Sequence, residues 1–168
     1  INMSFGGYQR SQIVEDALRD SALAPEHLEL EITESMLIGD IKRIELQLKR
    51  LKKMGIRVAL DDFGTGYSSL SYLKNFPVDV LKIDQSFIRE MTRDSRDANI
   101  ARAIIEMGHS LGQNIVAEGV ETEEQLRLLV HRDCDIIQGY FFSPPLPGNK
   151  MTDLLLQQKN KIGKLKPK

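Results

Sequence analysis

Apolar residues follow two different spacings along this chain, and the two spacings alternate. Short apolar runs, typical of buried parallel strands, begin near residues 1, 28, 56, 78, 114 and 136. Between these runs, apolar residues recur every three or four positions, as on one face of a helix, at 13–18, 41–51, 100–111, 126–130 and 154–155. Gly55 and Gly112 stand where two of the helices are expected to end. The pattern therefore predicts six strands that alternate with helices.

Alternating strands and helices predict an α/β fold with a parallel sheet and helices outside it. An open doubly wound sheet places its ligand at one topological switch point, whereas a barrel gathers residues from the ends of many strands. Nearly every predicted strand here ends in a polar group, which favours a TIM-like (β/α)₈ barrel. Six strands are too few for a full barrel, so we expect an incomplete one, with about two strands upstream of residue 1.

The polar groups at the strand ends are the strongest indication of chemistry. Five apolar stretches run into carboxylate, lysine or glutamine side chains: Glu31, Asp61 with Asp62, Lys82 with Asp84, Glu118 and Gln138. A buried carboxylate is costly unless it is paired or bound to a metal. The repetition therefore predicts one site at which charges from several strands converge on cations. Carboxylate and amide ligands point to magnesium or manganese rather than zinc.

The segment 61–70 has the clearest pattern of this kind. Adjacent residues on a regular strand point to opposite faces, but at a strand end the backbone can turn Asp61 and Asp62 toward one site. Two aspartates placed in this way can bridge or divide between two divalent cations. Gly64 and Gly66 allow the following loop to bend tightly. The alternative is an acidic turn without a ligand, and the four other polar strand ends favour the metal site.

Other candidate residues have a structural alternative. Glu34 is either a loop carboxylate near the site or a charge at a helix N-terminus. Lys82 can stabilise developing negative charge or orient a nucleophile, and a salt bridge to Asp84 is its alternative. Glu118 can serve as metal ligand or general base. Of two further glutamates, Glu121 and Glu123, we expect one at the rim of the site and one in the first turn of a helix.

An aromatic run, 140–142, follows Gln138. Aromatic residues in a last strand are most often part of the core, and the alternative is that one ring lies at the mouth of the site and stacks on a base. Ser143 and the prolines after it are expected to end the strand.

Composition limits the classes of partner. The 168 residues are 41% hydrophobic, enough for one substantial core, and the net charge of −1 provides no general attraction to polymeric nucleic acid or an anionic membrane. The sequence has no stretch that resembles a transmembrane helix. The single cysteine, Cys134, excludes an intrachain disulfide and fits a reducing, cytoplasmic compartment. We expect one domain over 1–148, followed by a C-terminal helix and basic tail over 149–168.

The motifs resemble those of the EAL-domain family of bacterial cyclic-di-GMP phosphodiesterases. The resemblance covers nearly the whole chain, from residue 2 to residue 147. The matching segments, in order, are 31–34, 61–66, 81–84, 117–121 and 138–140. The resemblance implies a TIM-like barrel with one antiparallel strand, and hydrolysis of one phosphodiester of cyclic di-GMP to give linear pGpG.

The resemblance also implies roles for individual residues. Asn2, Glu31 and Asp61 would hold one Mg²⁺ or Mn²⁺ ion, and Asp61 would bridge to a second, held also by Asp62 and Glu118. Lys82 would contact the attacking water, and Glu121 and Gln138 would line the site. Glu34 would anchor the loop from 63 to 70. This loop helps to form dimers in the family, so a homodimer is expected.

One departure from the family concerns its defining motif. The Glu-Ala-Leu segment is expected upstream of Asn2 and is absent from the sequence. The isolated chain is therefore expected to hydrolyse cyclic di-GMP poorly or not at all, while a parent protein that carries the motif is an active enzyme. The alternative is a degenerate EAL domain that acts as a cyclic-di-GMP receptor or a protein-interaction module. Sensory or GGDEF-type cyclase domains are expected upstream in the parent protein. If the parent is bound to a membrane, domains other than this one would anchor it.

Overall fold

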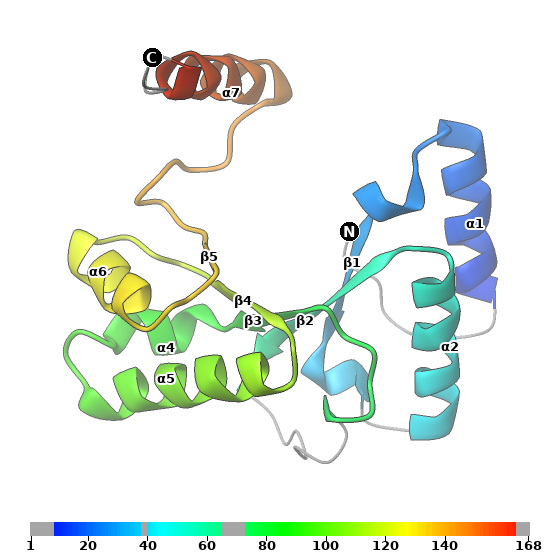
Figure 1. Ribbon diagram of the computed structural model, residues 1–168, viewed down its shortest axis with the longest axis horizontal. Coiled ribbons are helices and arrows are strands. Elements are labelled where there is room, and N and C mark those ends of the chain that lie inside the picture. The colour runs from blue at the N-terminus through cyan, green and yellow to red at the C-terminus, as the bar shows by residue number, and fades with distance from the viewer. Residues whose placement is uncertain (1–8, 38–39, 65–72, 164–168) are drawn as a thin grey trace.

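The sheet consists of five parallel strands whose order in space follows their order in the chain. The computed structural model describes residues 9–37, 40–64 and 73–163. Within them, the strands are β1 (Glu29–Thr33), β2 (Arg57–Phe63), β3 (Val80–Ile83), β4 (Asn114–Ala117) and β5 (Ile136–Ile137), paired in the order β1-β2-β3-β4-β5 (Figure 1). A doubly wound sheet reverses its strand order at a switch point, and these strands do not. They form a segment of a barrel, which confirms the predicted fold class.

Helices connect the strands, as the apolar spacing predicts. They are α1 (Gln9–Ser21), α2 (Ile41–Lys53), α4 (Gln85–Glu90), α5 (Ser95–Ser110), α6 (Glu123–His131) and α7 (Gly148–Gly163), with 3₁₀ turns at Pro25–His27 and Glu34–Leu37. Five of the helices match the predicted stretches. The short helix α4 was not predicted, because its six residues are too few to show a helical apolar period. The predicted strand near residue 1 lies outside the described residues, and none of the described helices is long and apolar enough to cross a membrane.

The two faces of the strands have different neighbours. Leu30, Leu60, Leu81 and Ile115 share one core cluster with helical residues such as Leu48, and α2 packs against β2 while α5 packs against β4. The alternate positions form a second, smaller cluster of buried side chains: Ala59, Val80 and Val116. Since side chains alternate along a strand, the residues two positions further along β2 and β3, Asp61 and Lys82, lie on the second face. This second face leads to the candidate site.

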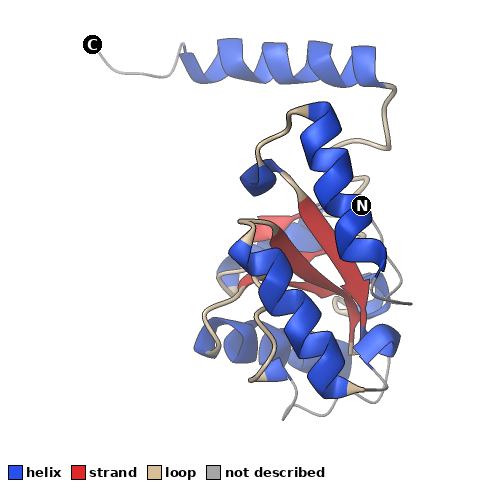
Figure 2. Cartoon of the chain, turned by 90° about the vertical axis from the view of Figure 1, so that its right-hand side faces the viewer, coloured by secondary structure: helices blue, strands red, loops and turns tan. Residues whose placement is uncertain are grey.

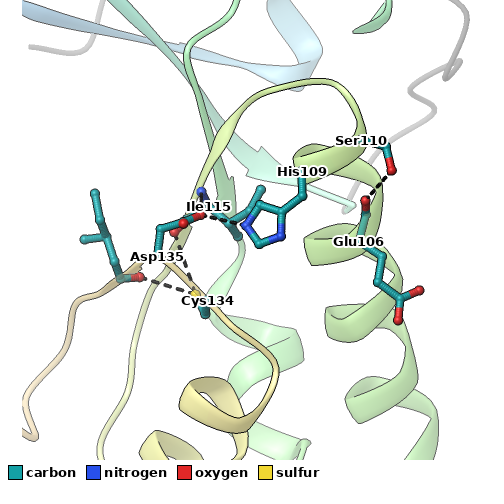
Figure 3. A network of polar contacts seen from close by, with 7 residues as sticks. Glu106, His109, Ser110, Ile115, Cys134 and Asp135 are labelled. Atoms are coloured by element: carbon teal, nitrogen blue, oxygen red, sulfur yellow. Dashed lines mark hydrogen bonds and ion pairs between the residues drawn. The ribbon is translucent and has the colours of Figure 1, made fainter.

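The opposite, N-terminal ends of the strands are joined by two similar contacts. Asp79, directly before β3, accepts a hydrogen bond from the backbone N–H of Val58 (2.8 Å) and pairs with Lys52 in the last turn of α2. Asp135, directly before β5, accepts from the backbone N–H of Ile115 and contacts His109 Nε2 in the last turn of α5, both at 2.8 Å (Figure 3). Each aspartate thus connects a strand start to the end of a preceding helix.

Cys134 lies beside the second of these contacts. Its Sγ donates to the carbonyl oxygen of Ile115 (3.7 Å; Figure 3) and to that of Ile136 (3.4 Å). Burial raises the pKa of the Cys134 thiol to about 11. The thiol is therefore protonated at neutral pH and acts as a weak hydrogen-bond donor.

The C-terminal segment is more exposed than the sequence predicts. Tyr140, Phe141 and Phe142 are 66%, 39% and 58% exposed, so the expectation that this aromatic run belongs to the core is wrong. The run follows a strand of only two residues and lies in a turn, where the chain has already left the sheet. Helix α7 lies away from the sheet in both views, with Leu155 and Leu156 exposed (Figures 1 and 2).

Candidate active site

The centre of the candidate site is the ammonium group of Lys82. Its Nζ lies 2.9 Å from Glu31 Oε1, 2.9 Å from Asp61 Oδ1 and 2.7 Å from Glu118 Oε1. These residues come from β3, β1, β2 and the position directly after β4, so four adjacent strands contribute. Parallel pairing brings the strand ends together, because Thr33 is in register with Asp61. The predicted convergence of Glu31, Asp61, Lys82 and Glu118 is therefore present in the structure.

The charges of this cluster depend on one another. Burial alone would lower the pKa of Lys82, but hydrogen bonds to Glu118, Glu31 and Asp61 raise it above its ordinary value. Burial raises the pKa of the Glu118 carboxyl, while the hydrogen bond and charge of Lys82 oppose that effect. Lys82 is thus a protonated ammonium that balances part of the charge of three carboxylates. Among the described residues, the ion pairs of Lys82 are with these carboxylates and not with Asp84, the alternative partner. The Asp84 side chain instead accepts a hydrogen bond from the backbone N–H of Ser86 and caps α4.

Asp62 stands at an irregularity at the end of β2. Its φ is +55°, in the left-handed region, and the pairing of β2 with β3 shifts register between Leu60 and Phe63. The Asp62 N–H donates to Asp61 Oδ1 (3.1 Å). Burial, followed by the charges of Asp61 and Asp84, raises the pKa of the Asp62 carboxyl. The backbone turn expected between the two aspartates is therefore present, and bulges of this kind often re-aim a side chain near an active site.

Glu34 is a buried carboxylate that contacts the next loop. It is 5% exposed, and its Oε2 accepts a hydrogen bond from the backbone N–H of Gly64 (3.1 Å). Gly64 has a φ of +99°, and a Cβ there would lie 2.8 Å from Phe87 Cε2, so glycine suits the position. This contact is at the start of the loop that Glu34 is predicted to anchor; residues 65–72 of that loop lie outside the described residues, as does Asn2.

Backbone hydrogen bonds join the segment after β4, which carries Glu121, to the segment that begins at Gln138. Val120 donates its N–H to the carbonyl of Gln138 (3.1 Å), and Phe141 donates its N–H to the carbonyl of Val120 (2.9 Å). Gly139 is needed here because a Cβ would lie 2.1 Å from Val120 O. The side chains of Glu121 and Gln138 are exposed, and their contact with a substrate stays a prediction.

Gln125 is a residue of this region that was not predicted. It is 5% exposed, and its side-chain oxygen accepts from the backbone N–H groups of Glu121 (2.8 Å) and Thr122 (2.9 Å). The signal in the sequence is the spacing of Thr122 and Gln125, which matches a helix capping box.

The donor chemistry of the cluster fits a hard divalent cation. Carboxylate oxygens of the kind that contact Lys82 are the ligands that Mg²⁺ and Mn²⁺ prefer. The part of the chain that the structure describes holds no group of three or more His, Cys, Asp or Glu side chains arranged to hold a metal ion. In this arrangement Lys82 supplies the positive charge among the carboxylates. The residues present therefore fit the cation by chemistry, while their geometry is that of an ion-pair cluster.

Comparison with known proteins relates the chain to one family. The EAL domain family matches residues 2–145. The cyclic di-GMP phosphodiesterase NbdA of Pseudomonas aeruginosa is 45% identical over 150 residues, which are 88% of this chain and 19% of that protein. From the same organism, the bifunctional diguanylate cyclase/cyclic di-GMP phosphodiesterase MucR is 46% identical over 138 residues, 82% of this chain and 20% of MucR. The chain spans about a fifth of the length of the curated relatives it matches.

Solved structures agree in sequence and in fold. The PaMucR phosphodiesterase in complex with c-di-GMP has a TM-score of 0.86 and 42% identity, over 89% of this chain and 62% of that one. A manganese/cy-diGMP complex of Klebsiella pneumoniae BlrP1 has a TM-score of 0.79 and 32% identity, over 86% of this chain and 38% of that one. From these matches, the chain belongs to the EAL domain family.

Proposed function

We propose that this chain carries most of the active site of a metal-dependent phosphodiesterase that hydrolyses cyclic di-GMP to linear pGpG. The observation that carries the proposal is the meeting of Glu31, Asp61 and Glu118 around Lys82 at the carboxyl ends of parallel strands. In barrels of this type, that end of the sheet is where active sites lie. The names of the relatives and the c-di-GMP in the matching complexes support this substrate.

The metal ligands would divide into two sets. Asn2, Glu31 and Asp61 would hold one Mg²⁺ or Mn²⁺ ion, and Asp61, Asp62 and Glu118 would hold the second. Two such ions neutralise phosphate charge and lower the pKa of a bound water toward neutrality. The manganese in the BlrP1 complex supports a divalent cation of this class.

Lys82 would act on the reacting groups directly. Its ammonium is protonated and nearly buried, with 7% of the residue exposed. A buried, preorganised positive charge stabilises negative charge that develops on a phosphoryl oxygen, and an ammonium can also orient the attacking water by hydrogen bonding. Glu118, 2.7 Å from Lys82, would either accept a proton from that water as general base or serve as a metal ligand alone.

The rim of the site would bind the rest of the dinucleotide. Glu121 and Gln138 would line the substrate, and the backbone contact between Val120 and Gln138 places their two segments together. Tyr140 is 66% exposed in the same segment, so its ring is free of the core and can stack on a guanine base.

A receptor is the second candidate, and one observation favours it. The ammonium of Lys82 forms ion pairs with three carboxylates of the site and balances part of their charge. A domain of this kind would bind cyclic di-GMP without turnover. Upstream sensory or cyclase domains in the whole protein, a homodimer and a cytoplasmic location remain proposals for either candidate; the cyclase named in MucR supports the first of them.

A chimera distinguishes the enzyme from the receptor. The segment of PaMucR that precedes its match to this chain is joined to residue 2, and conversion of cyclic di-GMP to pGpG is followed by chromatography in Mn²⁺. The enzyme proposal predicts turnover that Asp61→Asn abolishes. Binding of the dinucleotide with no turnover would favour the receptor, and absence of both would contradict the proposed function.

A further inference from the structure

The side chain of Gln125 makes hydrogen bonds to two different parts of the fold. Its Oε1 accepts from the backbone N–H groups of Glu121 and Thr122, at 2.8 Å and 2.9 Å. Its Nε2 donates to the backbone carbonyls of Ile88 (3.1 Å) and Arg89 (3.4 Å). The residue is 5% exposed, so these four contacts are made out of contact with bulk water. Buried amides retain such geometry because an unsatisfied polar group is costly.

The two partners of Gln125 belong to different strand-helix units. Ile88 and Arg89 lie in the last turn of α4, where carbonyl groups lack partners within the helix. Helix α4 begins directly after β3, which carries Lys82. Glu121 and Thr122 lie in the segment that connects β4 to α6. The Gln125 amide therefore links the unit that carries Lys82 to the segment that follows Glu118.

The segment from 118 to 122 is held at several points, and Gln125 is its outer support. Glu118 donates its N–H to the carbonyl of Ile83 (3.4 Å), at the end of β3. Gly119 has a φ of +70°, and a Cβ there would lie 2.7 Å from the Cβ of Gln85, so the segment runs against the first turn of α4. Beyond it, Gln125 makes the contact with the last turn of α4. The segment thus follows α4 from its start to its end.

We propose that Gln125 is a positioning residue of this site, which fixes Glu118 and Glu121 by tying their segment to α4. It touches neither the substrate nor the reacting atoms. The inference rests on the proposed function for its catalytic meaning, because Glu118 and Glu121 are site residues of that proposal. The structural part, the link between the segment and α4, rests on the hydrogen bonds alone.

A simpler role is helix capping, and two substitutions separate the roles. Thr122 accepts a hydrogen bond from the backbone N–H of Gln125 (3.2 Å) and is the N-cap of α6. Thr122→Ala removes this cap and leaves the contacts of the Gln125 side chain to α4. Gln125→Glu does the reverse: a glutamate at this position keeps the capping box and accepts from the same N–H groups, but a carboxylate has no N–H for the carbonyls of Ile88 and Arg89.

Backbone hydrogen exchange, followed by NMR on the 168-residue chain, measures the position of the segment directly. Gln125→Glu is expected to speed exchange at the amides of Glu118 and Val120 about tenfold, while Thr122→Ala changes them less than about threefold. Thr122→Ala is expected to lower the melting temperature because it removes a cap. Equal acceleration by the two substitutions, or none by Gln125→Glu, would overturn the proposal.

Affinity for cyclic di-GMP in the presence of Ca²⁺, which is used in place of Mn²⁺ to limit turnover, gives the functional readout. It is measured by calorimetry on the PaMucR chimera that carries each substitution. We expect Gln125→Glu to weaken binding about tenfold and Thr122→Ala to leave it within about twofold. The proposal is overturned if the loss of affinity in the two variants is ordered by their melting temperatures and not by whether they keep the contact to α4. Gln125 would then have a merely structural role. If the chimera without these substitutions neither binds nor hydrolyses the dinucleotide, the proposed function fails, whereas the exchange measurement still decides whether Gln125 positions the segment.

Discussion

Lys82 Nζ lies 2.7 Å from Glu118 Oε1, and the same ammonium contacts Glu31 and Asp61. One positive charge therefore holds three carboxylates from separate strands within hydrogen-bond distance of a single point. Without that charge the carboxylates would repel one another in a partly buried site. Lys82 thus stabilises the fold and, under the proposed function, also supplies the charge that acts on the phosphate.

Replacing Lys82 by methionine is expected to destabilise the chain by about 2–4 kcal/mol in the absence of divalent cations, because it leaves the carboxylates uncompensated. Urea unfolding measures the loss. Millimolar Mn²⁺ is expected to restore part of it, since a cation can replace the missing charge. The control is Lys49→Met, which removes an exposed pair with Glu45 and is expected to cost less than about 1 kcal/mol. Equal losses in the two variants would contradict this role of Lys82.

Gly64→Ala is expected to destabilise the chain by about 1–3 kcal/mol, because Gly64 has a φ of +99° and a Cβ would lie 2.8 Å from Phe87. Two other glycines are matched controls. Gly112 has a φ of +74°, but a Cβ there would meet no atom within 4 Å, so its alanine variant shows the cost of the backbone conformation alone. Gly148 has neither a positive φ nor a close neighbour. Thermal unfolding of the three variants should rank Gly64 as most destabilised and Gly148 as least. A different order would show that the Gly64 turn is not as tight as described.

Glu34→Gln is expected to weaken the hydrogen bond from the Gly64 N–H, since the acceptor loses its charge. The expected loss is about 1 kcal/mol in urea unfolding. The Gly64 amide should also exchange with solvent faster. Glu26→Gln, at an exposed position in a 3₁₀ turn, is the control and should change neither quantity. Unchanged exchange at Gly64 in the Glu34 variant would show that this carboxylate does not anchor the start of the loop.

Asp135 predicts a specific dependence of stability on pH. Burial alone would raise its pKa, but hydrogen bonds from the Ile115 N–H and from His109 lower it below the ordinary value of 3.8. The charged form is favoured in the folded state. Its stabilising effect is therefore fully present above that value, and it is lost as the pH falls through the lower pKa of the folded state.

Asp135→Asn should remove this acid dependence. Relative to the unsubstituted chain, the variant is expected to lose stability at neutral pH, and the difference should shrink as the pH falls below about 4. Glu45→Gln, in an exposed pair on α2, is the control and should show no such change. The lowered pKa of Asp135 would be contradicted if the difference in stability between the variant and the unsubstituted chain stayed constant down to low pH.

Much of the fold and the centre of the site could be predicted because the signals are local and periodic. Parallel strands place their carboxyl ends together, so Glu31, Asp61 and Glu118, each at the end of an apolar run, had to meet if the sheet formed. Their distances to Lys82 were beyond prediction, because they depend on pairing register, as between Thr33 and Asp61.

Other features depend on contacts between distant residues and left little trace in the sequence. Helix α4 is too short to show a period, and its cap, Asp84, was interpreted as a possible partner for Lys82. Gln125 acts through Ile88 and Arg89, which no local pattern connects to it. The exposure of Tyr140 follows from a two-residue strand, whereas an apolar run of that composition is typical of a longer buried one.

The most direct test of the central claim, that oxygen ligands from separate strand ends meet around divalent cations, is a titration of the chain with Mn²⁺ followed by NMR. Paramagnetic broadening should begin at the amides of Glu31, Asp61 and Glu118, and Asp61→Asn should abolish it at low Mn²⁺ concentration. Broadening that begins elsewhere, or that Asp61→Asn leaves unchanged, would contradict the account.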